Sequence, residues 1–133
     1  MSRTAVIAGE GLLAPAVVGA LDGPAVYALD GLNPLVQAAP FRLERLVPFL
    51  DKLVADGIEQ VVFAGAIRRP RLEPDLFDPQ TLQIVPRILM AMQTGDDAAL
   101  REVLAVFEES GLRVLSVDQI LPELVPQAGD SGG

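Results

Sequence analysis

The sequence predicts an α/β domain of three layers, with a mainly parallel sheet of about four strands between two layers of helices. Short apolar, β-branched runs alternate along the chain with segments whose apolar residues recur at helical spacing. The runs are apolar at successive positions, which is typical of strands buried on both faces of a parallel sheet. Each run ends at a glycine or an aspartate, where we expect the strand to give way to a loop.

The first third of the chain predicts two strands, a helix and a loop. Arg3–Ala8 is too short for a helix and is followed by glycine, so we expect a buried strand. Leu12–Leu21 is expected to form a short helix, because Pro15 is tolerated within a first turn. Ala25–Leu29 is the second predicted strand, and Gly31–Phe41, with two prolines and no period, is predicted to be a loop.

Helical spacing begins at Arg42, and an internal proline indicates that the regular helix starts near Val47 and ends at Gly57. Gln60–Ala64 is the third predicted strand, and Gly65–Pro79 is a long polar connection. The last third predicts two helices, a fourth strand and a short final helix, at Thr81–Met92, Ala98–Ser110, Leu112–Val117 and Asp118–Leu124. The order of these elements favours a Rossmann-like arrangement.

Composition limits the domain count and the class of function. A chain of 133 residues fits one domain, which we place at 1–125, with a Gly/Ser-rich linker or tail at 126–133. The absence of His and Cys excludes Cys/His nucleophile pairs, the usual zinc sites and disulfides. A net charge of −8 disfavours nucleic-acid binding, and no apolar run is long enough for a transmembrane segment. We therefore expect an intracellular domain.

Ligands of such folds gather where the strands end, and the first strand ends in a glycine-rich turn. Gly9 and Gly11 fit the pattern G-x-G-x-x-A, and Asp30 ends the next strand. Glycines allow a phosphate close to the backbone, and an acid can bind a ribose hydroxyl. The alternative is a tight turn that needs glycine for its dihedral angles alone.

Arginines follow the third predicted strand. Arg68, Arg69 and Arg71 lie within four residues, directly after Gly65–Ile67, in a chain that is otherwise acidic. Guanidinium groups at this edge of a sheet could hold an anionic ligand through bidentate hydrogen bonds. The alternative is ion pairing with a partner domain or with the acids just downstream, Glu73, Asp75 and Asp78.

Paired carboxylates at Asp96 and Asp97 could bind magnesium or transfer protons. Because they follow Gly95 and precede a helical stripe, an N-cap with a second acid at the positive end of the helix is the favoured interpretation. We therefore expect neither a catalytic residue nor a metal ligand in this chain.

Three motifs, in order, resemble the LpxI-type UDP-2,3-diacylglucosamine pyrophosphatases. The segment Ile7–Leu13 (IAGEGLL) looks like the opening strand and turn of that family, although Glu10 stands where the family usually has glycine. Val61–Pro70 (VVFAGAIRRP) looks like its strand followed by Gly-x-[Val/Ile]-x-Arg-Pro. Gly95–Arg101 (GDDAALR), with the later Phe-Glu and Gly, looks like its third motif.

The resemblance implies a cytoplasmic enzyme of lipid A biosynthesis. The family hydrolyses UDP-2,3-diacylglucosamine with magnesium to UMP and 2,3-diacylglucosamine 1-phosphate (lipid X), and its catalytic aspartate and metal belong to a C-terminal domain. This chain resembles the N-terminal domain, so the resemblance implies that it encloses substrate together with the other domain and is inactive alone. The magnesium site is then expected in the missing domain, with no cofactor in this fragment.

The resulting prediction for substrate binding is Gly9, Gly11, Gly65, Arg68 and Arg69, which would face the sugar-nucleotide lipid. Two alternatives stay open: an independent nucleotide-binding module that uses the first turn, and a non-catalytic oligomerisation domain. A homodimer and peripheral contact with the inner membrane also stay open.

Overall fold

A five-stranded sheet in which all strands are parallel forms the centre of the molecule. The computed structural model describes residues 3–67 and 72–121. The strands lie in the order β3-β2-β1-β4-β5, which is the order of a Rossmann-type sheet, so the predicted α/β fold is confirmed. Their bounds are β1 Arg3–Ala8, β2 Ala25–Leu29, β3 Ala39–Phe41, β4 Ile58–Ala64 and β5 Arg113–Leu115.

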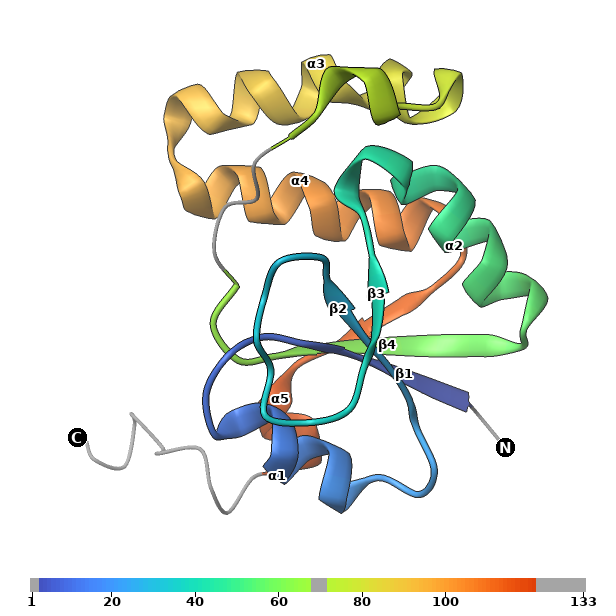
Figure 1. The fold of residues 1–133 in the computed structure, drawn as a ribbon, viewed down its shortest axis with the longest axis vertical. Coiled ribbons are helices and arrows are strands. Elements are labelled where there is room, and N and C mark those ends of the chain that lie inside the picture. Colours follow the sequence, from blue (N-terminus) through green and yellow to red (C-terminus); the bar gives the residue numbers. More distant parts are fainter. Residues whose placement is uncertain (1–2, 68–71, 122–133) are drawn as a thin grey trace.

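Helices cover both faces of the sheet, and one helix forms an additional layer (Figure 1). The first face carries α1 (Leu13–Ala20) and α5 (Val117–Ile120), and the second carries α2 (Leu46–Ala55) and α4 (Asp96–Glu109). The helix α3 (Pro79–Thr94) lies on α4 and α2, away from the sheet. Two 3-10 turns, η1 (Leu43–Arg45) and η2 (Pro74–Leu76), precede α2 and α3. Within the described ranges, no helix has the length and apolar character needed to cross a membrane.

The alternation of side chains along β1 divides the interior into two cores. Ala5 and Ile7 belong to the core under α2 and α4, whereas Val6 and Ala8 belong to the core under α1 and α5. The first core is larger and contains aromatic rings, with Phe41 stacked on Phe49 at 4.2 Å between centroids. Both faces of the sheet are therefore buried, as the continuous apolar runs predict.

The predicted number of four strands was too low because β3 lies inside the segment predicted to be a loop. Its three residues include Pro40, and a proline is tolerated there because β3 is an edge strand, paired only with β2. The helix predicted from Thr81 begins at Pro79 instead, since Asp78 accepts hydrogen bonds from the N–H groups of Gln80 and Thr81. The predicted tail at 126–133 lies outside the described residues.

Candidate functional site

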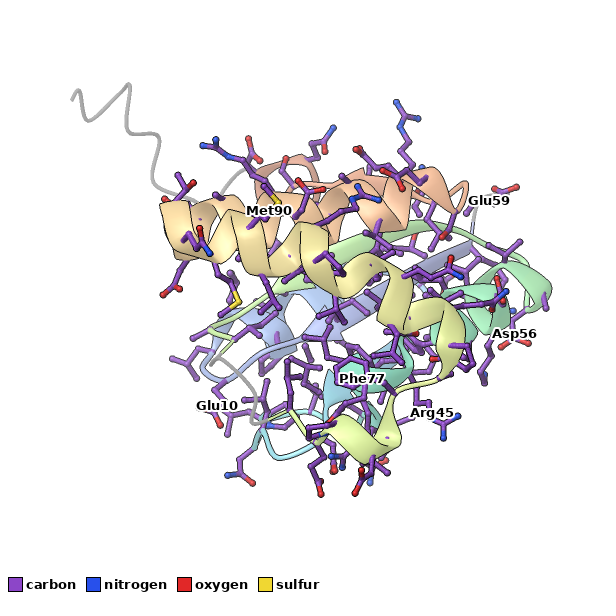
Figure 2. The ribbon with its side chains drawn as sticks, turned by 90° about the horizontal axis from the view of Figure 1, so that it is seen from above. Glu10, Arg45, Asp56, Glu59, Phe77 and Met90 are labelled. Carbon is purple, nitrogen blue, oxygen red and sulfur yellow. The ribbon has the colours of Figure 1, made fainter. Side chains whose placement is uncertain are left out.

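The loops that follow β1 and β4 are hydrogen bonded to each other at the carboxyl edge, the edge at which the strands end. The N–H of Glu10 donates to the carbonyl of Ala66 at 2.8 Å, and the N–H of Ala66 donates to the carbonyl of Glu10 at 2.9 Å. The N–H of Gly9 donates to the carbonyl of Ala64 at 2.7 Å. We call this arrangement of Gly9, Glu10, Gly65 and Ala66 the clasp. In Figure 2, Glu10 lies at this edge of the sheet, and Asp56 and Glu59 lie at the opposite edge.

Two glycines allow the clasp to form because its backbones approach too closely for a side chain. A Cβ atom at Gly9 would lie 2.5 Å from the carbonyl oxygen of Ala66, and one at Gly65 would lie 2.8 Å from the carbonyl carbon of Gly9. Gly65 also has a φ of +109°, which L side chains rarely adopt. Glycine at these positions therefore has a structural explanation that does not depend on a ligand.

The clasp occupies the point between β1 and β4 where the strand order reverses, which is where Rossmann folds hold dinucleotides. The amides of Gly9 and Glu10 already donate within it, so they are not available to a phosphate. The Glu10 carboxylate accepts a hydrogen bond from the N–H of Asn33 at 3.0 Å and adds negative charge. Gly11 lies outside these contacts, with φ +103° and open space around it. Substrate binding by Gly9, Gly11 and Gly65 stays a prediction.

A second feature of the carboxyl edge is an ion-pair cluster around Arg42, which directly follows β3. Its guanidinium donates to Asp30 at 2.6 Å, to Glu44 at 3.1 Å and to Glu73 at 2.7 Å. We call these four residues the Arg42 cluster. Glu44 also accepts a hydrogen bond from the backbone N–H of Glu73 at 2.8 Å. The cluster therefore joins the end of β2, the turn η1 and the segment that leads to α3.

Glu44 is unusually buried for a carboxylate, since only 3% of its surface is exposed. Burial raises the pKa of Glu44, but the hydrogen bonds from backbone N–H groups and from Arg42 outweigh it, and the net pKa is lowered. The hydrogen bond to Glu44 is the largest cause of a raised pKa for Arg42. The carboxylate is thus held in its ionised form by the partners that surround it.

The Arg42 cluster changes the interpretation of Asp30. This residue was a candidate for a ribose hydroxyl, and the structure instead pairs it with Arg42. The charge of Arg42 is compensated by three carboxylates, so this arginine is poorly suited to receive an anionic ligand. In the part of the chain that the structure describes, no group of three acids is arranged to hold a metal ion. No chemistry through magnesium is therefore assigned to the described residues.

An apolar pocket of about 240 Å³ lies between the carboxyl edge and the helices α3 and α4. Among the described residues that line it, Asp96 is the only charged one, and it stands at the start of α4. Ile67 and Leu72 line it as well, and they flank in the sequence the segment that contains the arginines. The strand ends contribute Ile7, Leu29, Phe41 and Phe63, and the helices contribute Ile88, Met92, Ala99, Leu100, Val103 and Phe107.

The other predicted site residues have separate outcomes. Arg68, Arg69 and Arg71 lie outside the described residues, whereas two of their predicted acidic partners, Glu73 and Asp78, are engaged elsewhere. The predicted N-cap at Asp96 was wrong by one position. Gly95 occupies that place, and Asp96 and Asp97 lie in the first turn of α4, where their charge favours the helix N-terminus. Asp75, the third of these acids, lies in η2.

Sequence reasoning missed the pocket and the Arg42 cluster. Ile88 and Val103 belong to the apolar stripes of two separate helices, and no local pattern says that the packed helices leave space between them. The two acids Asp30 and Glu73 are 43 positions apart, and only the end of β3 between them brings both to one guanidinium. A basic residue directly after a short apolar run, as at Arg42, is the one signal that could have drawn attention.

Comparisons with known proteins agree with the fold and the motifs. The family model of the LpxI N-terminal domain matches residues 3–124. A UDP-2,3-diacylglucosamine pyrophosphatase LpxI from Caulobacter vibrioides is 34% identical over 80 residues, which are 60% of this chain and 29% of that relative. The chain therefore matches less than a third of that relative's length.

Proposed function

Because the chain belongs to the LpxI N-terminal domain family, we propose that it is the substrate-enclosing N-terminal part of a UDP-2,3-diacylglucosamine pyrophosphatase. In this proposal the complete enzyme hydrolyses the sugar-nucleotide lipid to UMP and lipid X in the cytoplasm, as a step of lipid A biosynthesis. The chain contributes binding of the substrate, and a second domain contributes the catalysis.

The observation that carries the proposal is the apolar pocket at the carboxyl edge. Its volume of about 240 Å³ exceeds the roughly 150 Å³ of an apolar protein cavity that binds benzene. It is smaller than the roughly 300–1,000 Å³ of a pocket that encloses a drug-sized molecule. The pocket therefore suits a length of acyl chain better than a whole sugar nucleotide, and an acyl chain is what distinguishes this substrate from other UDP sugars.

The anionic part of the substrate needs cations, and the sequence supplies them next to the pocket. Ile67 and Leu72 line the pocket, and Arg68 and Arg69 lie between them in the chain. We assign contact with the phosphates to these two arginines, because Arg42 is already paired with carboxylates. The division places the apolar tail in the pocket and the charged group at its rim.

Catalysis is assigned to the second domain. Asp96 is the one described carboxylate that lines the pocket, Asp30, Glu44 and Glu73 converge on Arg42, and the described residues offer no metal-binding group of acids. Magnesium, the metal of the proposed complete enzyme, would polarise the pyrophosphate from that domain. The chain alone, mixed with UDP-2,3-diacylglucosamine and magnesium, should therefore release no UMP, and rapid release would overturn this division.

Binding can be tested directly by titration calorimetry of the chain with the acylated substrate and with its deacylated headgroup. We expect the acylated molecule to bind at least about tenfold more tightly, because apolar area enters the pocket. Equal affinity for the two molecules would contradict the proposal. Micromolar binding of UDP or NAD alone would favour an independent nucleotide-binding module instead.

A matched pair of variants separates the pocket from the rest of α4. Ala99 lines the pocket, whereas its neighbour Ala98 does not. The substitution Ala99→Leu should fill part of the cavity and weaken binding of the acylated molecule by about tenfold, while Ala98→Leu should leave it within about twofold. Melting curves of both variants establish that each is folded. Equal losses in the two variants would contradict a role of the pocket.

A further inference from the structure

Most of the described side chains that line the apolar pocket are fixed by helices or strands, but two are not. Ile67 and Leu72 lie in segments that belong to neither. Ile67 directly follows Ala66, whose N–H and carbonyl are hydrogen bonded to Glu10 in the clasp. Leu72 is 38% exposed and is not one of the side chains packed in either core, so burial alone does not fix it. Its place in the pocket wall therefore depends on a contact of the backbone beside it.

The backbone beside Leu72 is held by the carboxylate of Glu44. The N–H of Glu73, the next residue after Leu72, donates to Oε2 of Glu44 at 2.8 Å. The same oxygen accepts a hydrogen bond from the guanidinium of Arg42 at 3.1 Å. Hydrogen bonds to an ionised group are stronger than those between neutral groups, and burial of the carboxylate shields them from water. Leu72 is therefore one residue away from a strong backbone contact.

The other side of this contact also belongs to the pocket wall. Leu43 lies between Arg42 and Glu44 in the chain, and it lines the pocket. Unlike Leu72, it packs against the larger core, so its own position is fixed. The hydrogen bond between Glu44 and the N–H of Glu73 spans 29 positions of the chain. It therefore joins a fixed segment of the wall to one that has no other described hydrogen bond of its backbone to a strand or helix.

We infer that Glu44 is a positioning residue for the apolar pocket, and that it holds Leu72 in the pocket wall through the N–H of Glu73. The inference rests on the proposed function, because it assigns Glu44 to the binding of the same acyl chain. Glu44 does not itself line the pocket, so its effect on affinity passes through Leu72. A wall that is already in place binds an alkyl chain more tightly, because no ordering of the wall opposes binding.

The N–H of Glu73, and not its carboxylate, provides this attachment. The carboxylate is 2.7 Å from the guanidinium of Arg42, but it is 59% exposed, and ion pairs of exposed groups contribute little. The acceptor for the N–H is buried, and its removal leaves that donor without a partner among the described residues. Removal of the Glu73 side chain and removal of the Glu44 side chain should therefore have different effects on the pocket.

A double-mutant cycle tests whether Glu44 acts through Leu72, with n-octanol as an alkyl probe that carries no sugar or phosphate. Calorimetry of the folded chain should show that Glu44→Ala and Leu72→Ala each weaken octanol binding by at least about fivefold. The double variant should bind within about twofold of Leu72→Ala alone, because the wall that Glu44 positions is then already lost. Glu44→Gln keeps an acceptor for the N–H of Glu73, so it should restore most of the affinity.

Three controls separate positioning from a general loss of stability. Leu100 is also exposed, at 47%, and lines the pocket from α4, so the losses in Leu100→Ala and Glu44→Ala should multiply when the two are combined. Glu73→Ala keeps the N–H and should bind octanol within about twofold of the parent chain. Val17→Ala destabilises the core on the other face of the sheet, so it should leave octanol binding unchanged. Circular dichroism establishes that each variant is folded.

Unchanged octanol binding in Glu44→Ala, or losses that multiply in the double variant with Leu72→Ala, would overturn the inference. A parent chain that binds neither octanol nor the acylated substrate would contradict the proposed function instead. Positioning is then decided without a ligand, by NMR of the methyl groups. Glu44→Ala should shift the Leu72 methyl resonances and leave those of Val17 in place, and an unshifted Leu72 would overturn the inference.

Discussion

The clasp lies at the carboxyl edge of the sheet and the α3 layer lies above α4 and α2 (Figure 1), and different kinds of contact hold them. The clasp consists of backbone hydrogen bonds between loops that start at Gly9 and Gly65. The α3 layer is attached by side chains: the hydroxyl of Thr81 accepts from the N–H of Val47, and the guanidinium of Arg87 binds Glu102 and Glu109 of α4. Backbone contacts leave no room for a substituent, whereas side-chain contacts leave a pocket of about 240 Å³.

This difference teaches where a Rossmann-like fold can accept a ligand. A phosphate bound between the ends of β1 and β4 would have to break the hydrogen bonds between Glu10 and Ala66. Those hydrogen bonds join the two loops, so breaking them would cost stability. An apolar tail under α3 breaks none of these hydrogen bonds and gains contacts with the cavity wall. The same strand order can therefore serve a dinucleotide in one protein and, as we propose here, a lipid in another.

The largest effect is expected from a side chain placed in the clasp. In Gly9→Ala the new Cβ would lie 2.5 Å from the carbonyl oxygen of Ala66, so the two loops must separate. We expect a loss of about 3 kcal/mol or more in the free energy of unfolding. Gly65→Ala should cost a similar amount, since it combines a close contact with a positive φ. Urea denaturation measures both losses.

Two other glycines are matched controls for the clasp. Gly11 has a positive φ but open space, so Gly11→Ala should cost only about 1–2 kcal/mol. Gly19 lies in α1 with nothing within 4 Å of an added Cβ, so Gly19→Ala should stabilise the helix by about 0.5–1 kcal/mol. If Gly9→Ala lowered the free energy of unfolding no more than Gly11→Ala does, the clasp would have room for a side chain at Gly9. That result would contradict the close approach of the two loops.

An intermediate effect is expected at Glu44, which connects the strand ends to the segment leading to α3. Glu44→Ala leaves the N–H of Glu73 without its acceptor and removes one carboxylate from Arg42. We expect a loss of about 2–3 kcal/mol, with a smaller loss in Glu44→Gln, which keeps one acceptor oxygen. The exposed Glu59 at the opposite edge is the control, and Glu59→Ala should change stability by less than about 0.5 kcal/mol.

The same carboxylate predicts a dependence on pH. The folded-state pKa of Glu44 is lowered from 4.5, so the folded state favours its ionised form. Its contribution is complete above the unfolded pKa and is lost as the pH falls through the lower folded pKa. Chemical denaturation of the parent chain should therefore show stability falling more steeply below pH 4.5 than in Glu44→Gln. Parallel pH profiles for the two proteins would contradict the assignment.

The smallest effect is expected at the surface of the α3 layer. Arg87 contacts Glu102 at 2.8 Å and Glu109 at 2.7 Å, and it lowers the pKa of Glu109 through its hydrogen bond. All three side chains are partly exposed, so Arg87→Met should destabilise the chain less than Gly9→Ala, Gly65→Ala or Glu44→Ala. Salt at about 1 M should remove most of the difference, which urea midpoints at low and high salt measure. A loss as large as that of Gly9→Ala, or one insensitive to salt, would show that α3 is held as firmly as the clasp.

Local patterns were sufficient for much of the fold. The bounds of β1 and β2 agree with the sequence prediction, because a buried parallel strand is continuously apolar and each of these ends at a residue typical of turns. The family resemblance rested on three local motifs and was confirmed by the match over 3–124. The strand β3 escaped prediction because three residues with a proline carry too little pattern of their own.

The sequence by itself therefore determined the fold class, most of the elements and the family, since each depends on residues close together in the chain. It also showed that Gly9 and Gly65 are glycines, but not that each is needed because of the other, 56 positions away. The closed clasp, the ionised Glu44 and the pocket under α3 were decided only by the tertiary structure. The physical reason is that hydrogen-bond partners, burial and unfilled volume belong to pairs of segments, and no single segment contains them.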